Sequence, residues 1–169
     1  MAPSTAPVSN VIDRRIGAGF AGEIDPTNNA TVDNIRLDPD DAPGAFGVPL
    51  VPVAGAVGTV FRKFLAGDDG SSIKGFLTRD ETLIKESDGA PKKDAIHGRI
   101  IRGGLSVVCS IGDPVREEPV YVRTVADAPK AVGDIEATEA AGENVEIPNV
   151  VWALDGKDAN GICRIRIAQ

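Results

Sequence analysis

Short runs of alternating hydrophobic and polar residues recur along the chain, and they predict β-strands. The clearest runs are TVDNIRL (31–37), PVYVRTV (119–125), VEIPNVVWAL (145–154) and GICRIRI (161–167). In the last run the apolar side chains alternate with two arginines, as expected for a strand with one dry face and one wet face. Many short strands without intervening helical patterns indicate an all-β fold, either an antiparallel sandwich or a barrel, and we expect a single antiparallel sandwich.

Other segments carry weaker or special signals. Residues 95–111, AIHGRIIRGGLSVVCSI, hold two β-branched runs joined at Gly103-Gly104. A glycine pair accepts the positive φ angles of a tight turn, so we expect a hairpin there. The apolar run GVPLVPV (47–53) belongs at a sheet edge or in a loop, because its two prolines cannot donate ladder hydrogen bonds. Four further segments are interpreted as either a short helix or a strand (59–67), a strand (73–79), a loop (80–94) and a strand (130–138).

The N-terminus differs from the rest of the chain. Residues 1–12 have no charged side chain and contain two prolines. We expect an extended arm over 1–12, which either frays or orders on a partner. Residues 13–169 are expected to form one β domain.

Composition narrows the function. The chain has 169 residues, a net charge of -7 and 4% aromatic residues. The charge argues against a nucleic-acid partner, which needs clustered Lys and Arg. Scarce aromatics disfavour stacking on bases or sugars. No apolar run approaches the roughly 20 residues of a membrane span, and no secretory signal is present.

The run GAGFAG (17–22) matches the glycine pattern of dinucleotide-binding loops, but its surroundings do not fit. That pattern requires a helix directly after it, whose N-terminus receives the phosphates. Here Pro26 and the pair Asn28-Asn29 follow, and they favour a turn. The segment is therefore interpreted as a Gly-rich bend between strands, without a nucleotide cofactor.

No constellation supports catalysis. His97 is the only histidine. A pairing with Ser106 or Cys109 is formally open, but no carboxylate nearby in sequence would orient the ring, and a polar strand-end residue is the preferred interpretation. Cys109 and Cys163 are predicted to be reduced, half-buried strand residues. We expect no catalytic residue, and a protein that is not an enzyme.

Metal binding has no support either. The acidic clusters at 38–41, 68–69 and 117–118 are typical of solvated turns. The segment DGKDANG (155–161) lacks the alternating acids of an EF-hand loop and is predicted to be a hairpin loop. We expect no metal and no cofactor.

Four segments, in this order, resemble the structural cement proteins of tailed bacteriophages. They are RRIGAGFAGEIDPTNNATVDNIRL (14–37), GFLTRDETL (75–83), GRIIRGGLSVVCSIGDPVREEPVYVR (98–123) and GICRIRIAQ (161–169). The family's opening pattern of Gly-Phe, Gly, Ile and Asp is matched by Gly19, Phe20, Gly22, Ile24 and Asp25. The family's G-D-P-V-Y-V turn and strand is interrupted here by residues 116–119.

The resemblance implies a small jelly-roll-type β domain that binds the major capsid protein on the outer surface of a phage head and clamps neighbouring capsomers. It implies a virion protein made in the host bacterial cytoplasm and a homo-oligomer, either dimer or trimer, without nucleic-acid or membrane partners. A host- or carbohydrate-binding β module on the virion surface is the alternative, and a cupin-like or hydrolytic β enzyme is a third class.

Two sets of residues are candidates for contact. Trp152 and Tyr121 are expected in the core, with a subunit interface as the alternative. The arm is expected to lie extended along a capsid edge. Its contact residues would be Ala2, Pro3, Ser4, Thr5, Ala6, Pro7, Val8, Ser9, Asn10, Val11 and Ile12.

Overall fold

The computed structural model describes residues 19–27, 29–56, 59–79, 89–93 and 95–168. The predicted arm, 1–12, lies outside them, as does most of the predicted loop 80–94. The described residues form nine strands and one short 3₁₀ helix, which confirms the all-β class. In chain order they are β1 (Thr31–Leu37), β2 (Leu50–Pro52), β3 (Val60–Lys63), η1 (Gly70–Ser72), β4 (Phe76–Leu77), β5 (Ile96–Ile111), β6 (Pro119–Arg123), β7 (Ile135–Glu136), β8 (Asn144–Trp152) and β9 (Ile162–Ile167).

The strand pairing is mixed, which corrects the purely antiparallel prediction. β1 and β3 are parallel, and so are β5 and β7, whereas the other paired strands are antiparallel. In each parallel pair the chain passes through an intervening strand before it returns, and such a crossover permits a parallel neighbour. The alternation within one strand does not encode the direction of its partner. The jelly-roll-type sandwich stays a prediction.

Five strands of the C-terminal half close into a ring. β5 pairs with β9, β9 with β8, β8 with β6, β6 with β7, and β7 again with β5. We call this the C-terminal ring. Its inward side chains form the larger hydrophobic cluster, which includes Val107, Val122 and the fully buried Trp152. Trp152 therefore belongs to the core, as predicted, while Tyr121 is only half-buried.

A second, smaller ring forms on the N-terminal half of β5. β5 pairs with β1, β1 with β3, and β3 with β2, while β4 pairs with β5 on its other side. β2 stands at the end of the strand order, as its prolines predicted. A bridge between Pro49 and Phe76, and a hydrogen bond of 2.9 Å from Leu50 N to Gly75 O, join this end to β4. We call the result the N-terminal ring; it encloses the smaller cluster around Ile35, Leu50 and Leu77.

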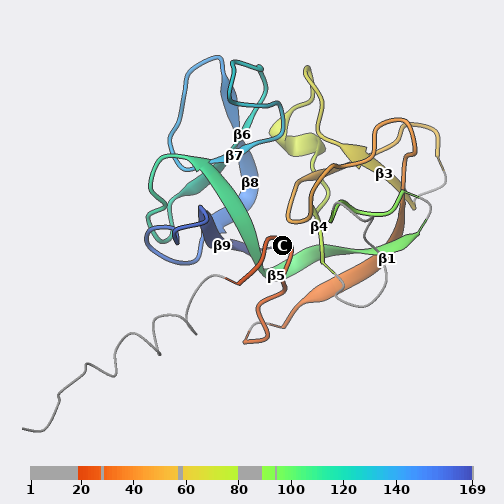
Figure 1. Ribbon diagram of the computed structural model, residues 1–169, viewed down its shortest axis with the longest axis horizontal. Coiled ribbons are helices and arrows are strands. Elements are labelled where there is room, and N and C mark those ends of the chain that lie inside the picture. The colour runs from red at the N-terminus through yellow and green to blue at the C-terminus, as the bar shows by residue number, and fades with distance from the viewer. Residues whose placement is uncertain (1–18, 28, 57–58, 80–88, 94, 169) are drawn as a thin grey trace, which may run out of the picture.

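β5 is one continuous strand, so the predicted hairpin at Gly103-Gly104 is wrong. β5 crosses both halves of the molecule, with β6–β9 on one side and β1, β3 and β4 on the other (Figure 1). The partner changes at the glycine pair, because Arg102 pairs with Thr31 of β1 and Gly103 with Ile167 of β9. Gly103 has φ +117°, and a Cβ there would lie 2.9 Å from the Ala30 Cα. The glycine is needed for this close approach and not for a turn.

Candidate functional site

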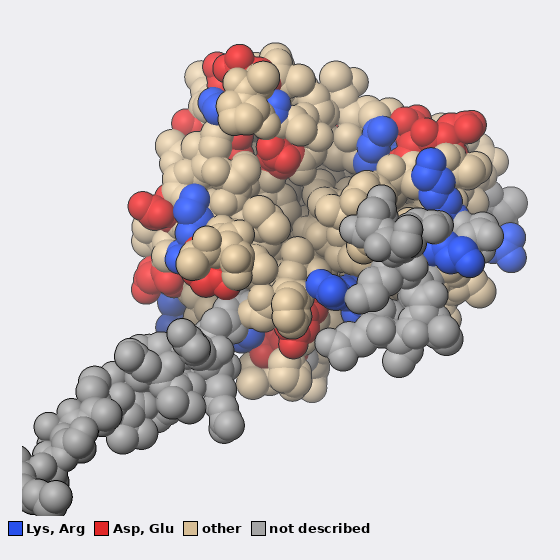
Figure 2. Space-filling view, viewed as in Figure 1, with Lys and Arg blue, Asp and Glu red and all other residues tan. Residues whose placement is uncertain are grey.

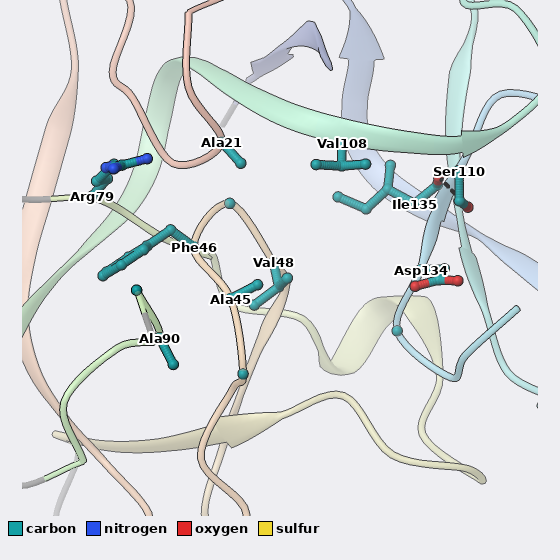
Figure 3. A pocket seen from close by; sticks show the side chains of 14 residues that line it. Ala21, Ala45, Phe46, Val48, Arg79, Ala90, Val108, Ser110, Asp134 and Ile135 are labelled. Carbon is teal, nitrogen blue, oxygen red and sulfur yellow. Dashed lines mark hydrogen bonds between the residues drawn. The ribbon is translucent and has the colours of Figure 1, made fainter. Parts of the chain in front are cut away.

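An open groove lies where the two rings meet, and it is the candidate functional site. One wall is the loop 44–48, which precedes β2; the other holds Val108 and Ser110 of β5 with residues 133–135 (Figure 3). Ala21, Arg79 and residues 89–90 complete it. We call this the inter-ring groove. Its volume of about 490 Å³ is in the range of sites that hold small ligands or short peptide segments.

Close glycine packing positions the loop wall of this groove. A Cβ on Gly47 would lie 2.7 Å from the Gly22 nitrogen and 3.0 Å from the Ser106 carbonyl oxygen. Gly22 N in turn donates a hydrogen bond of 2.7 Å to Ser106 O. The last glycine of GAGFAG therefore pins a loop against β5 and has no role in holding phosphate. As predicted, the described part of this run is a bend, but it precedes the first described strand and does not join two strands.

The groove is mainly apolar, and its polar side chains are already engaged. Phe46, Val48, Val108 and Ile135 contribute apolar surface. Ser110 Oγ donates a hydrogen bond of 3.0 Å to Ile135 O, drawn in Figure 3. A carboxylate oxygen of Asp134 accepts 2.8 Å from Ala131 N. Such walls suit docking of an uncharged segment better than acid–base chemistry.

One exposed large hydrophobic side chain, Val108, lines this groove, and another, Phe20, contacts the lining residue Arg79. Val108 is 47% exposed, whereas its neighbour Val107 faces the ring interior and is 0% exposed. Phe20 is 59% exposed, and the Arg79 guanidinium lies 4.9 Å from its ring centroid. Solvent-facing apolar groups at a groove are typical of a surface that binds a partner.

The nucleophile–histidine pairings left open by the sequence are excluded. His97 and Ser106 lie nine residues apart in one extended strand, which separates them by about 30 Å. His97 is buried at the start of β5, where its Nε2 lies 2.7 Å from Lys92 O. The pairing would have required the hairpin that the continuous strand replaces.

The cysteines are free strand residues, as predicted, but they are fully buried and not half-buried. Both thiols lie in strands of the C-terminal ring. Burial raises the pKa of the Cys163 thiol to about 11 and also raises that of Cys109. Neither thiol is therefore an activated nucleophile.

The acidic segments have structural roles. Asp68 pairs with Arg62 at 2.6 Å, and this guanidinium lowers the pKa of the carboxyl group. Asp158 Oδ1 accepts from the backbone nitrogens of Asn160 and Ile162 at 2.8 and 2.9 Å, which shapes the loop between β8 and β9 as predicted. Within the described ranges, no group of three potential metal ligands occurs.

The structure contains a buried ionic cluster that the sequence pattern did not predict. Arg123 Nε donates 2.5 Å to Glu136 Oε1, and Arg123 Nη1 donates 3.0 Å to Glu143 Oε2. Asn144 Nδ2 donates 2.6 Å to Glu136 Oε2 and 2.9 Å to Thr138 O. The cluster fastens the connection between β7 and β8 onto β6. Its polar groups bond to one another, so it stabilises the ring and offers no reactive group.

Charged side chains of both signs are interleaved on the visible face, without a broad field of one sign (Figure 2). No helix in the described part of the chain is long and apolar enough to cross a membrane.

Comparison with known proteins gives a family match and a likeness in fold. The model of the family "Structural cement protein (E217 gp24/Pam3 gp6)" matches residues 8–168. A chain of the solved structure "The capsid of Myoviridae Phage XM1" is similar with a TM-score of 0.67 and 17% identity, over 100% of this chain and 99% of that one. At this identity the likeness concerns the fold. No curated protein matches the sequence significantly.

Proposed function

The chain belongs to the phage structural cement protein family, and we propose that it binds the outer surface of a phage head and clamps neighbouring capsomers of the major capsid protein. Membership gives it a structural role at the capsid, in a family that is not one of enzymes. The single observation that carries the proposal is the family match over residues 8–168. The full-length likeness in fold to a chain from a phage capsid structure supports it.

The architecture suits a mechanical role. Two rings that share β5 pair their strands on both sides, and each is filled by a hydrophobic cluster. Such closure leaves few sheet edges open to unintended pairing. A packed body whose strands are hydrogen-bonded to one another can carry force between two attached surfaces without unfolding.

Clamping requires no single strong contact. A subunit that touches two capsomers binds the second at high effective concentration, so that modest patches give durable attachment. Only the assembled shell offers both surfaces at the right spacing. Binding therefore stabilises the shell by mass action.

The finer features of the proposal follow from the resemblance and from the arm. The subunit acts as a dimer or trimer, is made in the host bacterial cytoplasm and is a jelly-roll-type domain over residues 13–169. Residues 2–12 lie extended on the major capsid protein and add backbone hydrogen bonds.

Co-sedimentation with purified heads that lack this chain tests the proposal. We expect saturable retention on the heads of its own phage, and a higher temperature of head disruption when the chain is bound. Heads of an unrelated phage are the control and should retain none. Failure to bind its own heads, or equal binding to both kinds, would contradict the proposal.

A further inference from the structure

We propose that the inter-ring groove binds residues 8–12 of the same chain, so that in the free subunit the N-terminal arm folds back onto its own domain. This inference concerns the free chain and does not rest on the proposed capsid function.

The chemistry of the groove favours an uncharged occupant. Val48, Val108 and Ile135 give it apolar walls, and its serine and aspartate are already bonded within the domain. A charged side chain facing these apolar walls would lose water without gaining a partner, which costs free energy. The lining residue Arg79 already lies against the Phe20 ring. The groove therefore favours an uncharged segment with small or aliphatic side chains.

The composition of residues 8–12 matches this groove. Residues 8–12 are Val-Ser-Asn-Val-Ile, which is uncharged and carries three β-branched aliphatic side chains. In an extended chain, alternate residues share a face, so Val8, Asn10 and Ile12 lie together. The family match begins at residue 8, so this segment is part of the pattern that defines the family and is not an unrelated extension.

The described chain begins next to the groove. It starts at Gly19, and Ala21 already lines the groove. The six intervening residues, 13–18, span at most about 20 Å when extended, and they include Gly17. That length suffices for a return to the groove at whose rim the arm is attached. A tether this short gives the segment an effective concentration in the millimolar range, so a weak contact is enough to hold it.

Docking of the arm would also account for the exposed Val108 side chain in the groove. Val108 is 47% exposed, whereas its neighbours in β5, Val107 and Cys109, are buried. An aliphatic segment in the groove would remove this surface from water. The arm cannot occupy the groove and lie on the capsid at the same time. Docking in the groove would therefore compete with binding of the arm to the shell.

Cysteine cross-linking of the free chain tests the inference. We combine Asn10→Cys with Ala45→Cys on the loop wall and add a short bis-maleimide at low protein concentration. The native Cys109 and Cys163 are buried with raised pKa values, so they react slowly, and each single variant controls for them. The matched control pair combines Asn10→Cys with Ala159→Cys, which is exposed in the β8–β9 loop and does not line the groove.

We expect an intramolecular cross-link at least several-fold more abundant in the groove pair than in the control pair. Adding Val108→Ser should lower its yield several-fold, whereas Val125→Ser, equally exposed but outside the groove, should not. A cross-link mainly between two copies would overturn the assignment to the chain's own arm. Equal yields in both pairs, or no cross-link, would overturn docking altogether. Loss of head binding with this cross-link retained would count against the proposed function alone.

Discussion

Arg123 and Glu136 form a buried ion pair between two strands of the C-terminal ring, with Nε and Oε1 2.5 Å apart and the two side chains 1% and 0% exposed. β6 contributes the arginine and the adjacent β7 contributes the glutamate. Removing two charges from water is costly, and here the cost is offset by further hydrogen bonds from Asn144 and to Glu143. The pair fixes the position of the short strand β7, which closes the ring.

Glu136→Gln should destabilise the fold by about 3 kcal/mol or more, because it removes the buried counter-charge of the Arg123 guanidinium and leaves only the half-exposed Glu143 carboxylate. Urea unfolding, followed by circular dichroism, measures this loss. Glu117→Gln is the matched control: it breaks the exposed pair with Arg166 and should cost less than about 1 kcal/mol. Equal losses in the two variants would show that the buried pair contributes nothing special.

Val107→Asp and Val122→Asp should each prevent folding. Both side chains are 0% exposed inside the C-terminal ring, and an unpaired buried charge costs several kcal/mol. Val108→Asp, one position along the same strand, places the charge on the opposite, exposed face and should leave a folded chain. Far-UV circular dichroism and size-exclusion chromatography distinguish these results. Native-like behaviour of the first two variants would contradict the assignment of strand faces.

The Cys163 thiol should resist alkylation in the folded chain. Its pKa of about 11, against an ordinary value of 9.0, lowers the thiolate fraction about 100-fold at pH 8, and burial slows the reaction further. Iodoacetamide labelling, read by mass spectrometry with and without urea, measures the ratio. Equal labelling rates in both states would contradict the buried environment.

The raised pKa of the Cys163 thiol also makes the stability of the fold depend on pH. Between pH 9 and pH 11 the folded chain keeps the thiol proton that the unfolded chain has lost. The stabilisation by the buried neutral thiol is therefore complete below pH 9 and is lost as the pH rises towards 11.

Deletion of residues 2–12 should lower occupancy on phage heads while leaving the thermal unfolding of the domain essentially unchanged. The arm precedes all the described strands, and the contact proposed for residues 8–12 in the inter-ring groove is weak, so the hydrophobic clusters do not depend on the arm. Quantitative co-sedimentation and calorimetry of the same preparations give both readouts, with the full-length chain as the reference. Unchanged occupancy would dismiss the arm as a capsid contact.

The sequence predicted individual strands better than their arrangement. The run 31–37 is β1 with the predicted bounds, and its buried residues Ile35 and Leu37 alternate with exposed Arg36, as expected for a strand with one buried face. The segment 59–67, which fitted a helix or a strand, contains β3. By contrast, only two residues of 73–79 and two of 130–138 pair as strands, β4 and β7. Propensity is local, whereas the length of a strand depends on what its partners offer.

The inter-ring groove could not be predicted from local patterns. It lies between segments that are far apart in the sequence, and its shape depends on Gly22 and Gly47 packing against each other. The sequence marks both positions only as glycines. The glycines at 17–22 matched a phosphate-loop pattern that their surroundings did not fit, and those at 103–104 were wrongly assigned to a hairpin. Positive φ and close approach are both uses of a missing Cβ, and only the tertiary structure distinguishes them from a turn.

The most direct test of the clamp is cryo-electron microscopy of intact heads of the phage that encodes this chain. We predict density for the two-ring domain on the outer surface, in contact with two neighbouring capsomers. Heads without such density, or density that touches only one capsomer, would contradict the account.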